Sequence, residues 1–582
     1  MDGHPYCHRI GIHNMARKPV GLIYGVDDTP PFGVSVLLGL QHVFVMTAGW
    51  IMVVVIVTTI GGTEDQVANV LRMSMIASGI ATILQSLANS PLGSGYFCPI
   101  SAGPAYISAS TIAGRTGGLS AIFGLSMISG LFEGLLSRVL PKLRPLFPPE
   151  VTGLVVTMVG VELITLGTPR FLGFQNGDGP HGTATAVAAL TLATMIAPTV
   201  WGKGKIKLYP LLIGLVTGCV CAHLLGVFPT ARVEQALAAP MFSLPRKAVP
   251  GWSFNVDLLP AFLIASLAST LKSVGDLTLC QKINDAEWTR TDMKSVSGGM
   301  LAGAIGTGLS GLLGGIGQST FSSNVGLSLA TGATSRAIAI PCGVLMIVLA
   351  FLPKLAAFFS VMPDPVMGAI LVYVACYMIV AGVQVITSRM LDSRRVFVVG
   401  IPLIFGLSVD MVPGLFRGVP HHLQPLVSSS LAVSTLLVVA LNLLFRIGVT
   451  KRQVLTFTHG VDDPDKVYEF MQTRGGAWGA RRDVIMRATA ALDEFLESTT
   501  APGLVTGPLH AEVTFDEFNL DIDVRYDGTP FALTSARPTV EALAADATAV
   551  VGLSSFLILH YADRVTSEAV DGRCHVHMHF EH

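Results

Sequence analysis

Long apolar segments fill the chain up to about residue 450, and shorter periodic patterns follow them. A helix that crosses a bilayer needs about 20 apolar residues. Segments of this kind are predicted near 32–60, 67–88, 118–138, 149–168, 182–200, 208–228, 257–280, 296–315, 337–356, 364–387, 395–414 and 426–448. Two shorter pieces, about 99–114 and 321–333, are interrupted by Gly, Pro, Ser or Thr. The pattern predicts a polytopic, all-α membrane protein with about 14 transmembrane segments.

The two interrupted pieces stand at corresponding places, third from the start, in the two halves of this series. Hydrocarbon cannot hydrogen-bond a free backbone, so irregular chain at membrane depth must be buried in protein or line a cavity. Corresponding short segments in two halves of a transporter point to an inverted repeat with the substrate site between them.

Composition and charge agree with this class. The chain is 51% hydrophobic and 13% charged, whereas soluble domains carry about 25% charged residues. Lys and Arg favour alternate loops, which predicts cytoplasmic termini at the plasma (inner) membrane. The favoured loops contain Arg138, Lys142, Arg144, Lys203, Lys205, Lys207, Lys282, Arg290, Lys294, Arg336, Arg389, Arg394 and Arg395.

The last part of the chain has the patterns of a soluble α/β domain. Helices are predicted at 463–474, 480–498 and about 538–562. Strands are predicted at 509–516 and 519–526, and a closing hairpin at 564–581. The predicted organisation is therefore an N-terminal cytoplasmic segment at 1–30, a transporter domain at 31–450 and a cytoplasmic α/β domain at 455–582.

Several polar motifs interrupt the apolar segments. Gln41 and His42 lie in the first span, and Lys272 and Asp276 lie in the span at 257–280. Asn324, Gly326, Thr331 and Gly332 lie in the second interrupted piece, and the polar run at 24–31 precedes the first span. In this order the motifs resemble those of the nucleobase–ascorbate transporter family, the uracil, xanthine and urate permeases.

The resemblance implies a 7+7 inverted repeat divided into a core domain and a gate domain. It also implies a nucleobase substrate held by the core, coupling to protons and a homodimer. Asp276 matches an acidic or histidine position of the site, and Asn324 and Thr331 match polar residues of the family motif. His42 matches a histidine that braces the core.

Two positions depart from the family pattern. Members that bind uracil or xanthine carry Glu where this chain has Lys272, and Glu or Gln where it has Ser323. An ammonium has three donors and no acceptor, so the usual pairing with ring N–H groups is in doubt. Lys272 and Asp276 are four apart on a helix and can touch. Three interpretations stay open: Lys272 holds an anionic substrate, the pair gates coupling, or the pair is structural.

Further polar residues in the predicted spans have functional or structural interpretations. Glu162 is a second partner of Lys272 or a proton site, or it faces a polar seam. Glu133 is expected to snorkel at a span end. His42 is expected to be internally hydrogen-bonded rather than titrating. Beside Ala105, Tyr106 stacks on a planar ring or packs in the core.

The C-terminal domain weakly resembles the ATPase fold of anti-sigma-type serine kinases. Ser498 and Tyr526 stand where active members carry a metal-holding Asn and an adenine-holding Asp, so we expect a degenerate domain that hydrolyses no ATP. His575, His577 and His579 alternate on the last strand. With a fourth ligand such as His582 this spacing can bind zinc, but a solvated strand face is the interpretation that we favour, and no metal site is predicted.

The sequence as a whole predicts a secondary active transporter of nucleobases such as xanthine, urate or uracil. Its expected partners are the substrate and the lipid bilayer, with no nucleic acid and no cofactor besides a proton or sodium as coupling ion. The alternatives are an anion carrier or exchanger on the same scaffold, and a transport-dead membrane sensor that signals through the C-terminal domain. An enzyme is not expected, because no nucleophile–base constellation or phosphate loop is present.

Overall fold

The protein divides into two compact units, Met1–Asn442 and Leu443–His582. The computed structural model describes residues 18–582 with gaps at 89, 144–147, 175–179, 204–205, 207–208, 229–239, 250, 287, 289–290, 388–392, 413, 415–417, 421–426, 428, 447–449, 459–464, 479, 500–503, 517–518, 535, 539–546, 571–572 and 582. Most of the predicted segment 1–30, the turn of the predicted hairpin at 564–581 and His582 therefore lie outside the described residues.

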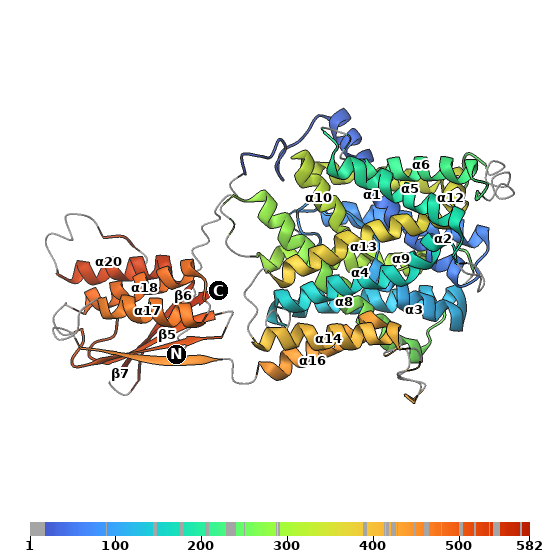
Figure 1. Ribbon diagram of the computed structural model, residues 1–582. Helices are drawn as coiled ribbons and strands as arrows, with labels where there is room; N and C mark the ends of the chain where they lie inside the picture. Colours follow the sequence, from blue (N-terminus) through green and yellow to red (C-terminus); the bar gives the residue numbers. More distant parts are fainter. Residues whose placement is uncertain are drawn as a thin grey trace. The chain divides into compact units, whose positions relative to one another are not determined.

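The first unit is helical (Figure 1). Among the described residues, eight helices are long and apolar enough to cross a membrane, which makes the chain a multi-pass membrane protein. The unit contains α1 (Phe32–Thr59), α2 (Glu64–Gln85), α3 (Ile107–Leu143), α4 (Pro149–Leu172), α5 (Gly182–Val200), α6 (Pro210–Leu224), α8 (Leu259–Asn284), α9 (Met293–Leu313), α10 (Ser322–Thr331), α11 (Ala339–Ala350), α12 (Pro353–Ser360), α13 (Asp364–Ile386), α14 (Ser393–Met411) and α16 (Ser430–Phe445).

Local sequence signals explain several helix ends. Thr63 and Gln66 form a reciprocal capping box at the start of α2. Within α3, Gly118 has φ 68° and ψ −169°, which breaks the helix between the predicted pieces at 99–114 and 118–138. The predicted span at 337–356 is divided, because α11 ends at Ala350 and α12 begins at Pro353.

The two interrupted segments meet in the interior. Strand β1 (Ile100–Ala102) pairs antiparallel with β2 (Gln318–Thr320). The short helix η1 (Pro104–Tyr106) and α3 follow β1, and α10 follows β2. Hydrogen bonds from Gly103 N to Gly317 O and from Phe321 N to Pro99 O, both 2.9 Å, extend the ladder. The pairing therefore satisfies backbone groups that hydrocarbon would leave unpaired.

Glycines allow three helix pairs to approach closely. A Cβ added to Gly79 of α2 would lie 2.5 Å from the carbonyl oxygen of Gly343 in α11. The same holds for Gly130 of α3 against α9 and for Gly153 of α4 against α13, at 2.4 and 2.7 Å from backbone atoms. Without a hydrophobic drive between helices in lipid, close backbone contact of this kind is a main source of association.

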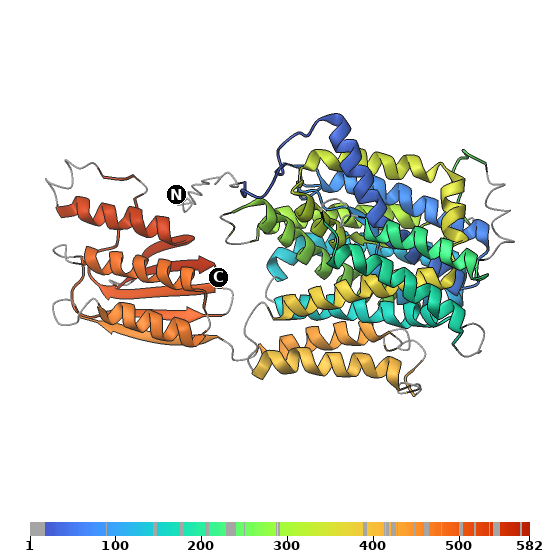
Figure 2. The same cartoon turned by 45° about the horizontal axis from the view of Figure 1, so that its top comes forward.

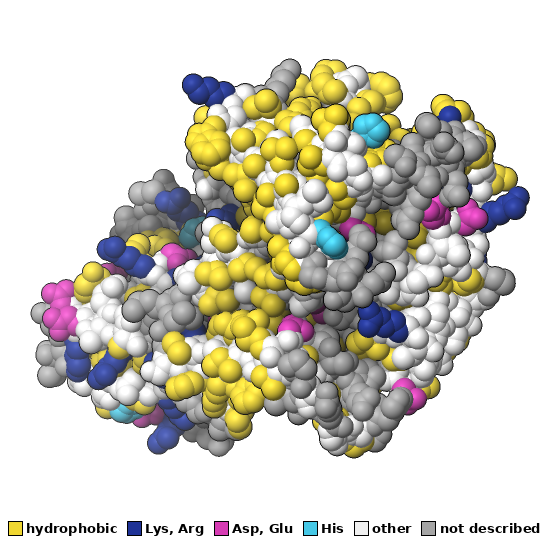
Figure 3. Space-filling view, turned by 45° about the vertical axis from the view of Figure 1, so that its right-hand side comes forward, with side chains coloured by type: hydrophobic (Ala, Val, Ile, Leu, Met, Phe, Trp, Pro, Cys, Tyr) yellow, Lys and Arg dark blue, Asp and Glu magenta, His cyan; other side chains and the backbone are white. Residues whose placement is uncertain are grey.

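The outer surface of this unit suits a bilayer. Figure 3 shows hydrophobic side chains spread over large areas of one face, with charged groups scattered among them. Exposed examples are Leu131, Leu135, Val216, Val220 and Leu224. Apolar area of this extent on a soluble monomer would be an aggregation hazard, whereas in a membrane protein it contacts lipid.

The second unit is a two-layer α/β fold, with helices on one face of an antiparallel sheet (Figures 1 and 2). The sheet order is β3-β4-β5-β7-β6. Its elements are β3 (Lys451–Phe457), α17 (Asp465–Trp478), α18 (Arg482–Ser498), β4 (Leu509–Phe515), β5 (Asn519–Asp527), α20 (Ala547–Tyr561), β6 (Arg564–Val570) and β7 (Arg573–Glu581). Strand β3, which the sequence analysis did not predict, begins before residue 455.

Candidate functional site

A buried ion pair lies where β2 crosses α8. Lys272 Nζ donates to Asp276 Oδ2 at 2.9 Å and to the carbonyl oxygen of Thr320 at 2.5 Å. Thr320 Oγ1 also donates to Asp276 Oδ2, at 2.6 Å. The side chains of Lys272 and Asp276 are only 3% and 9% exposed. The expected contact one helical turn apart is therefore present, and the strand backbone completes it.

The two charges of this pair compensate each other, and each charged group also forms a hydrogen bond to Thr320. Two donors of the ammonium and one carboxylate oxygen are engaged. Burying either charge alone would be strongly unfavourable, and a buried pair is tolerated only with good geometry and further hydrogen bonds. In this conformation Lys272 is thus held by the protein.

Gln318 anchors β2 to the helices around it. Its Nε2 donates to Ser310 Oγ at 3.1 Å and to Ile316 O at 3.0 Å, and its Oε1 accepts from Ser78 Oγ at 2.6 Å. Thr307 Oγ1 donates to Gln318 O at 3.1 Å. These bonds join β2 to α2 and α9, so the strand beside Lys272 is fixed in place.

Tyr106 and Glu133 form a second buried polar contact. Tyr106 Oη donates to Glu133 Oε1 at 2.7 Å and lies 3.1 Å from Ser266 Oγ of α8. Glu133 is 4% exposed, so the prediction that it snorkels at a span end is wrong: the tyrosine hydroxyl gives the carboxylate a partner inside the protein. The sequence signal that could have identified it is an ionisable residue within an apolar span.

Glu133 lines a small polar cavity with about 210 Å³ of empty space. Only about 10 Å³ of this space can hold the centre of a water-sized sphere, which is room for about one water and far below the roughly 300–1,000 Å³ of common ligand pockets. The other lining residues are Ser269, Thr270, Ser273, Met300, Gly303, Gln318 and Ser319. Ser273 lies 3.2 Å from Thr320 Oγ1, so the cavity adjoins the Lys272–Asp276 pair.

Ala105 lines a separate cavity with about 250 Å³ of empty space, beside α8 and residues 429–432. At its edge Ser429 Oγ donates to Glu162 Oε1 at 2.9 Å, and Glu162 is 2% exposed. No hydrogen bond or ion pair joins Glu162 to Lys272 among the described residues. The structure thus brings Glu162 to the Ala105 cavity rather than to the lysine.

His42 and Asn324 lie together in the interior. Asn324 Nδ2 donates to the carbonyl oxygen of His42 at 3.4 Å, and the His42 ring meets Phe97 edge-on at 4.6 Å. Within the described part of the chain, neither ring nitrogen of His42 has a hydrogen-bond partner, nor do Asn324 Oδ1 and Gln41 Nε2. The prediction of an internally hydrogen-bonded His42 is therefore wrong; the ring packs edge-on against Phe97 instead.

The remaining motif residues lie on α10 or at its end. Ser323 is exposed on α10. Thr331 Oγ1 donates to Leu327 O at 2.9 Å within its own helix. Gly332 ends α10 with φ 65°, a left-handed conformation that favours glycine, and its carbonyl oxygen accepts from Ile23 N and Tyr24 N. The conspicuous Thr-Gly signature thus ends a helix and binds the N-terminal segment.

The two C-terminal residues chosen by resemblance are buried in the core of the second unit. Ser498 Oγ donates to Phe495 O at 2.5 Å within α18. Tyr526 Oη donates to Thr529 O at 3.1 Å, and its ring packs 5.5 Å from that of Phe495. Both side chains are occupied by internal contacts in this structure.

The chain has clear relatives among known proteins. The profile of the xanthine/uracil permeases, described as a permease family, matches residues 33–415. A provisionally named purine permease of Clostridium perfringens is 30% identical over 74% of this chain and 94% of its own length. The xanthine permease XanP of Escherichia coli is 26% identical over 73% and 94%, and the uric acid permease PucJ of Bacillus subtilis is 28% identical over 70% and 92%.

These matches confirm the resemblance inferred from the motifs and the expectation of a transporter rather than an enzyme. With a family profile covering more than half of its length, the chain belongs to the xanthine/uracil permease family.

Proposed function

We propose that this protein is a secondary active transporter of nucleobases such as xanthine, urate or uracil, coupled to protons or sodium. The observation that carries the proposal is the buried polar site at the pairing of β1 with β2. Three relatives whose names specify purine, xanthine or uric acid transport support the substrate class.

The proposed architecture is a 7+7 inverted repeat. Counting α3 as two segments around Gly118 gives seven segments from α1 to α6, and α8, α9, α10, α11, α13, α14 and α16 form the other seven. The repeat would relate α2 to α9, and the second part of α3 to α11. In agreement with this, α2 packs on α11 and α9 packs on α3, each at a glycine contact. Arg170 pairs with Asp364 and Arg395 with Glu150 between α4 and the α13–α14 region.

Helix packing supports a division into core and gate. Helices α1, α2, α3, α8, α9, α10 and α11 pack mainly among themselves, and α4, α5, α6 and α13 form a second group that includes α14. The cavity at Ala105 is lined by η1, α3 and α8 of the first group and by residues 429–432. We take the first group as the core and the second, with α16, as the gate.

Substrate recognition would use the polar groups next to α8. The family glutamate is replaced by Lys272, so acceptors for ring N–H groups must come from elsewhere, and Glu133 and Gln318 of the adjoining cavity are suited to this role. An ammonium favours an anionic form of the base, such as urate. Opening of the Lys272–Asp276 pair would expose that charge to substrate.

The flanking regions complete the proposal. Both termini lie in the cytoplasm at the plasma membrane, the transporter domain spans 31–450, and 455–582 form a cytoplasmic domain that hydrolyses no ATP. The engagement of Ser498 and Tyr526 in internal contacts supports a degenerate domain. A homodimer is the expected assembly.

Uptake into proteoliposomes tests the function. Labelled urate, xanthine and uracil are offered with and without a pH or sodium gradient to wild type, Lys272→Ala and the control Lys282→Ala. Lys282 is exposed near the end of the same helix. We expect gradient-driven uptake of urate or xanthine that falls about tenfold or more in Lys272→Ala alone, since bonds to charged groups contribute about 1.5–3 kcal/mol.

Two outcomes count against the proposal. If none of the three bases accumulates under either gradient, the protein is no nucleobase symporter. Transport of uracil without urate would defeat the preference for an anionic base.

A second candidate, an anion carrier on the same scaffold, is favoured by Lys272 and predicts uptake of small carboxylates in place of bases.

A further inference from the structure

The sheet of the second unit has one apolar and one polar face. Along β7 the residues Cys574, Val576, Met578 and Phe580 are buried in the core. The alternate residues His575, His577 and His579 point away from that core and are 26–38% exposed. Three imidazoles therefore stand in a row on the open face.

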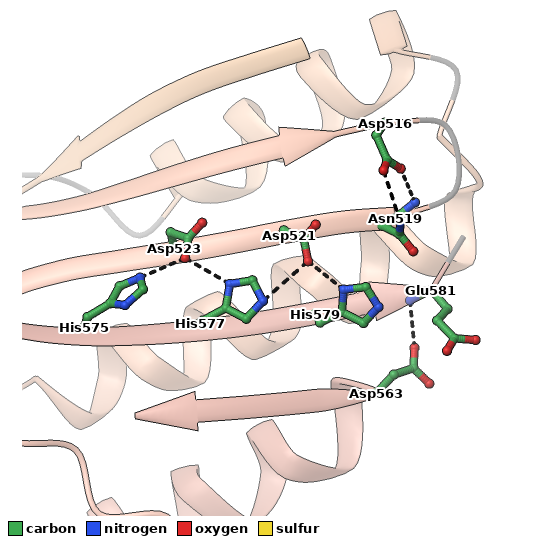
Figure 4. A network of polar contacts seen from close by, with 9 residues as sticks. All are labelled: Asp516, Asn519, Asp521, Asp523, Asp563, His575, His577, His579 and Glu581. Atoms are coloured by element: carbon green, nitrogen blue, oxygen red, sulfur yellow. Dashed lines mark hydrogen bonds and ion pairs between the residues drawn. The ribbon is translucent and has the colours of Figure 1, made fainter. Parts of the chain in front are cut away.

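The register of β5 places carboxylates beside this row. Asp523 lies directly opposite His577, and Asp521 lies opposite His579 (Figure 4). Asp523 Oδ1 accepts from His575 Nε2 at 2.8 Å and from His577 Nδ1 at 2.9 Å. Asp521 Oδ1 accepts from His579 Nδ1 at 2.6 Å and lies 3.6 Å from His577 Nε2.

Three of these groups converge on one point. One ligand atom each from Asp521, His577 and His579 lie within 4.8 Å of one another. Ligands of a tetrahedral Zn²⁺, at about 2.0–2.1 Å from the ion, stand roughly 3.4 Å apart. Side-chain rotations alone can close the difference, because strands β5 and β7 already fix the three Cβ positions.

Asp523 sets the orientation that such a site requires. Because the Nδ1–H of His577 donates to Asp523, the lone pair of His577 is on Nε2, which faces Asp521. A metal-bound histidine commonly donates its other N–H to a carboxylate in this way, which fixes tautomer and ring direction. His575 binds the same oxygen of Asp523 and holds that carboxylate in turn.

The charged residues of neighbouring strands do not neutralise Asp521 and Asp523, so both carboxylates can take part in a metal site. Glu512 of β4, opposite Asp523, is paired with Arg452 and lies 3.8 Å from Arg525. Among the described residues, Asp521 and Asp523 form their ion pairs with histidines and with no Arg or Lys.

We propose that Asp521, His577 and His579 form a binding site for a divalent transition-metal ion such as Zn²⁺, with Asp523 as a positioning residue. Two imidazoles and one carboxylate suit borderline ions rather than Mg²⁺ or Ca²⁺. On binding, the ion takes the place of the proton between His579 Nδ1 and Asp521, and the neutral His579 then carries its one ring proton on Nε2. The bound ion ties β5 to β7 through side chains.

Metal titration of the full-length protein tests this site. Detergent-purified, tag-free protein is stripped with chelator and dialysed against Zn²⁺, and bound zinc is measured by mass spectrometry. The variants are His579→Gln, Asp521→Asn and Asp523→Asn. The matched control is His510→Gln, on the same face of the sheet at β4. The N-terminal His4, His8 and His13 are common to all samples, so differences from wild type report on the site.

We expect His579→Gln and Asp521→Asn to lose one equivalent of bound zinc, and His510→Gln to retain it. Asp523→Asn should weaken binding about 10–100-fold, as loss of an outer-sphere partner does. Co²⁺ provides an independent measurement, because its visible absorption reports coordination by nitrogen and oxygen. Equal zinc content in wild type and a His577→Gln/His579→Gln double variant of unchanged elution volume would overturn the proposal, as would absence of micromolar binding in wild type.

Discussion

Removing one partner of the Lys272–Asp276 pair should destabilise the first unit far more than removing both. Lys272→Met leaves a buried carboxylate whose remaining described donor is Thr320, and Asp276→Asn leaves a buried ammonium. Breaking a buried pair in this way costs about 3–5 kcal/mol. In the double variant no charge remains, and its stability should stay close to that of wild type, because replacing both members of a buried pair is often neutral.

The size of the first unit converts these losses of unfolding free energy into shifts of the melting temperature. Unfolding entropy is about 2.1 cal/mol/K per residue, which for a unit of the length of Met1–Asn442 is roughly 0.9 kcal/mol/K. Each single variant should therefore melt about 3–6 °C below wild type, and the double variant should melt close to wild type. The assay is tryptophan fluorescence during heating in detergent at fixed scan rate.

Lys282→Met is the control, because Lys282 is exposed on the same helix, and it should melt like wild type. The decisive quantity is the departure from additivity. If the double variant melts as low as the sum of the two single shifts, Lys272 and Asp276 do not stabilise each other and the argument for a closed pair fails.

Three further predictions follow from other contacts. Tyr106→Phe removes one of the hydrogen bonds to Glu133, and a hydrogen bond to a charged group contributes about 1.5–3 kcal/mol. If this bond positions Glu133 for substrate, initial uptake rates should fall about tenfold at equal protein, and an unchanged rate would exclude that role. Gly343→Leu places a side chain against the backbone of Gly79, where even a Cβ would lie 2.5 Å from the carbonyl oxygen. Size-exclusion chromatography should then show loss of monodisperse protein, and normal elution would contradict the packing. Burial, and to a lesser extent neighbouring acidic groups, raise the pKa of Asp493 to about 6. The folded unit therefore holds this proton more tightly than the unfolded chain does. Its stability falls as the pH rises from 3.8 to about 6. Asp493→Asn should raise the stability of residues 450–582 by on the order of 1 kcal/mol at pH 7 after solvent screening, with no gain at pH 3.5, as measured by urea unfolding.

Apolar periodicity predicted most helices because a bilayer imposes length and composition directly on the sequence. The contact between Lys272 and Asp276 was also predictable, since their spacing alone places them on one helix face. The helices, strands and hairpin of the second unit follow the predicted pattern closely. Strand β3 was missed because only Leu455 and Phe457 of its seven residues are buried, which leaves little alternation to detect.

What the sequence did not show depends on tertiary partners. The burial of Glu133 depends on Tyr106, 27 positions away. Gln318 and Thr320 resemble ordinary loop residues until the pairing of β2 with β1 places them between helices. The surroundings of His42 depend on Phe97 and Asn324, which no local pattern connects to it. Likewise, the row of histidines on β7 was visible, but the carboxylates beside it required the register of β5.

The short ladder between β1 and β2 also constrains how this molecule can work. Its two strands come from distant parts of the chain, and breaking their hydrogen bonds would leave amides stranded where no water can replace them. Neither short helix can therefore tilt or slide independently of the other. Any rearrangement of the first unit must therefore move η1 and α10 together, and sliding is confined to the helix surfaces around them.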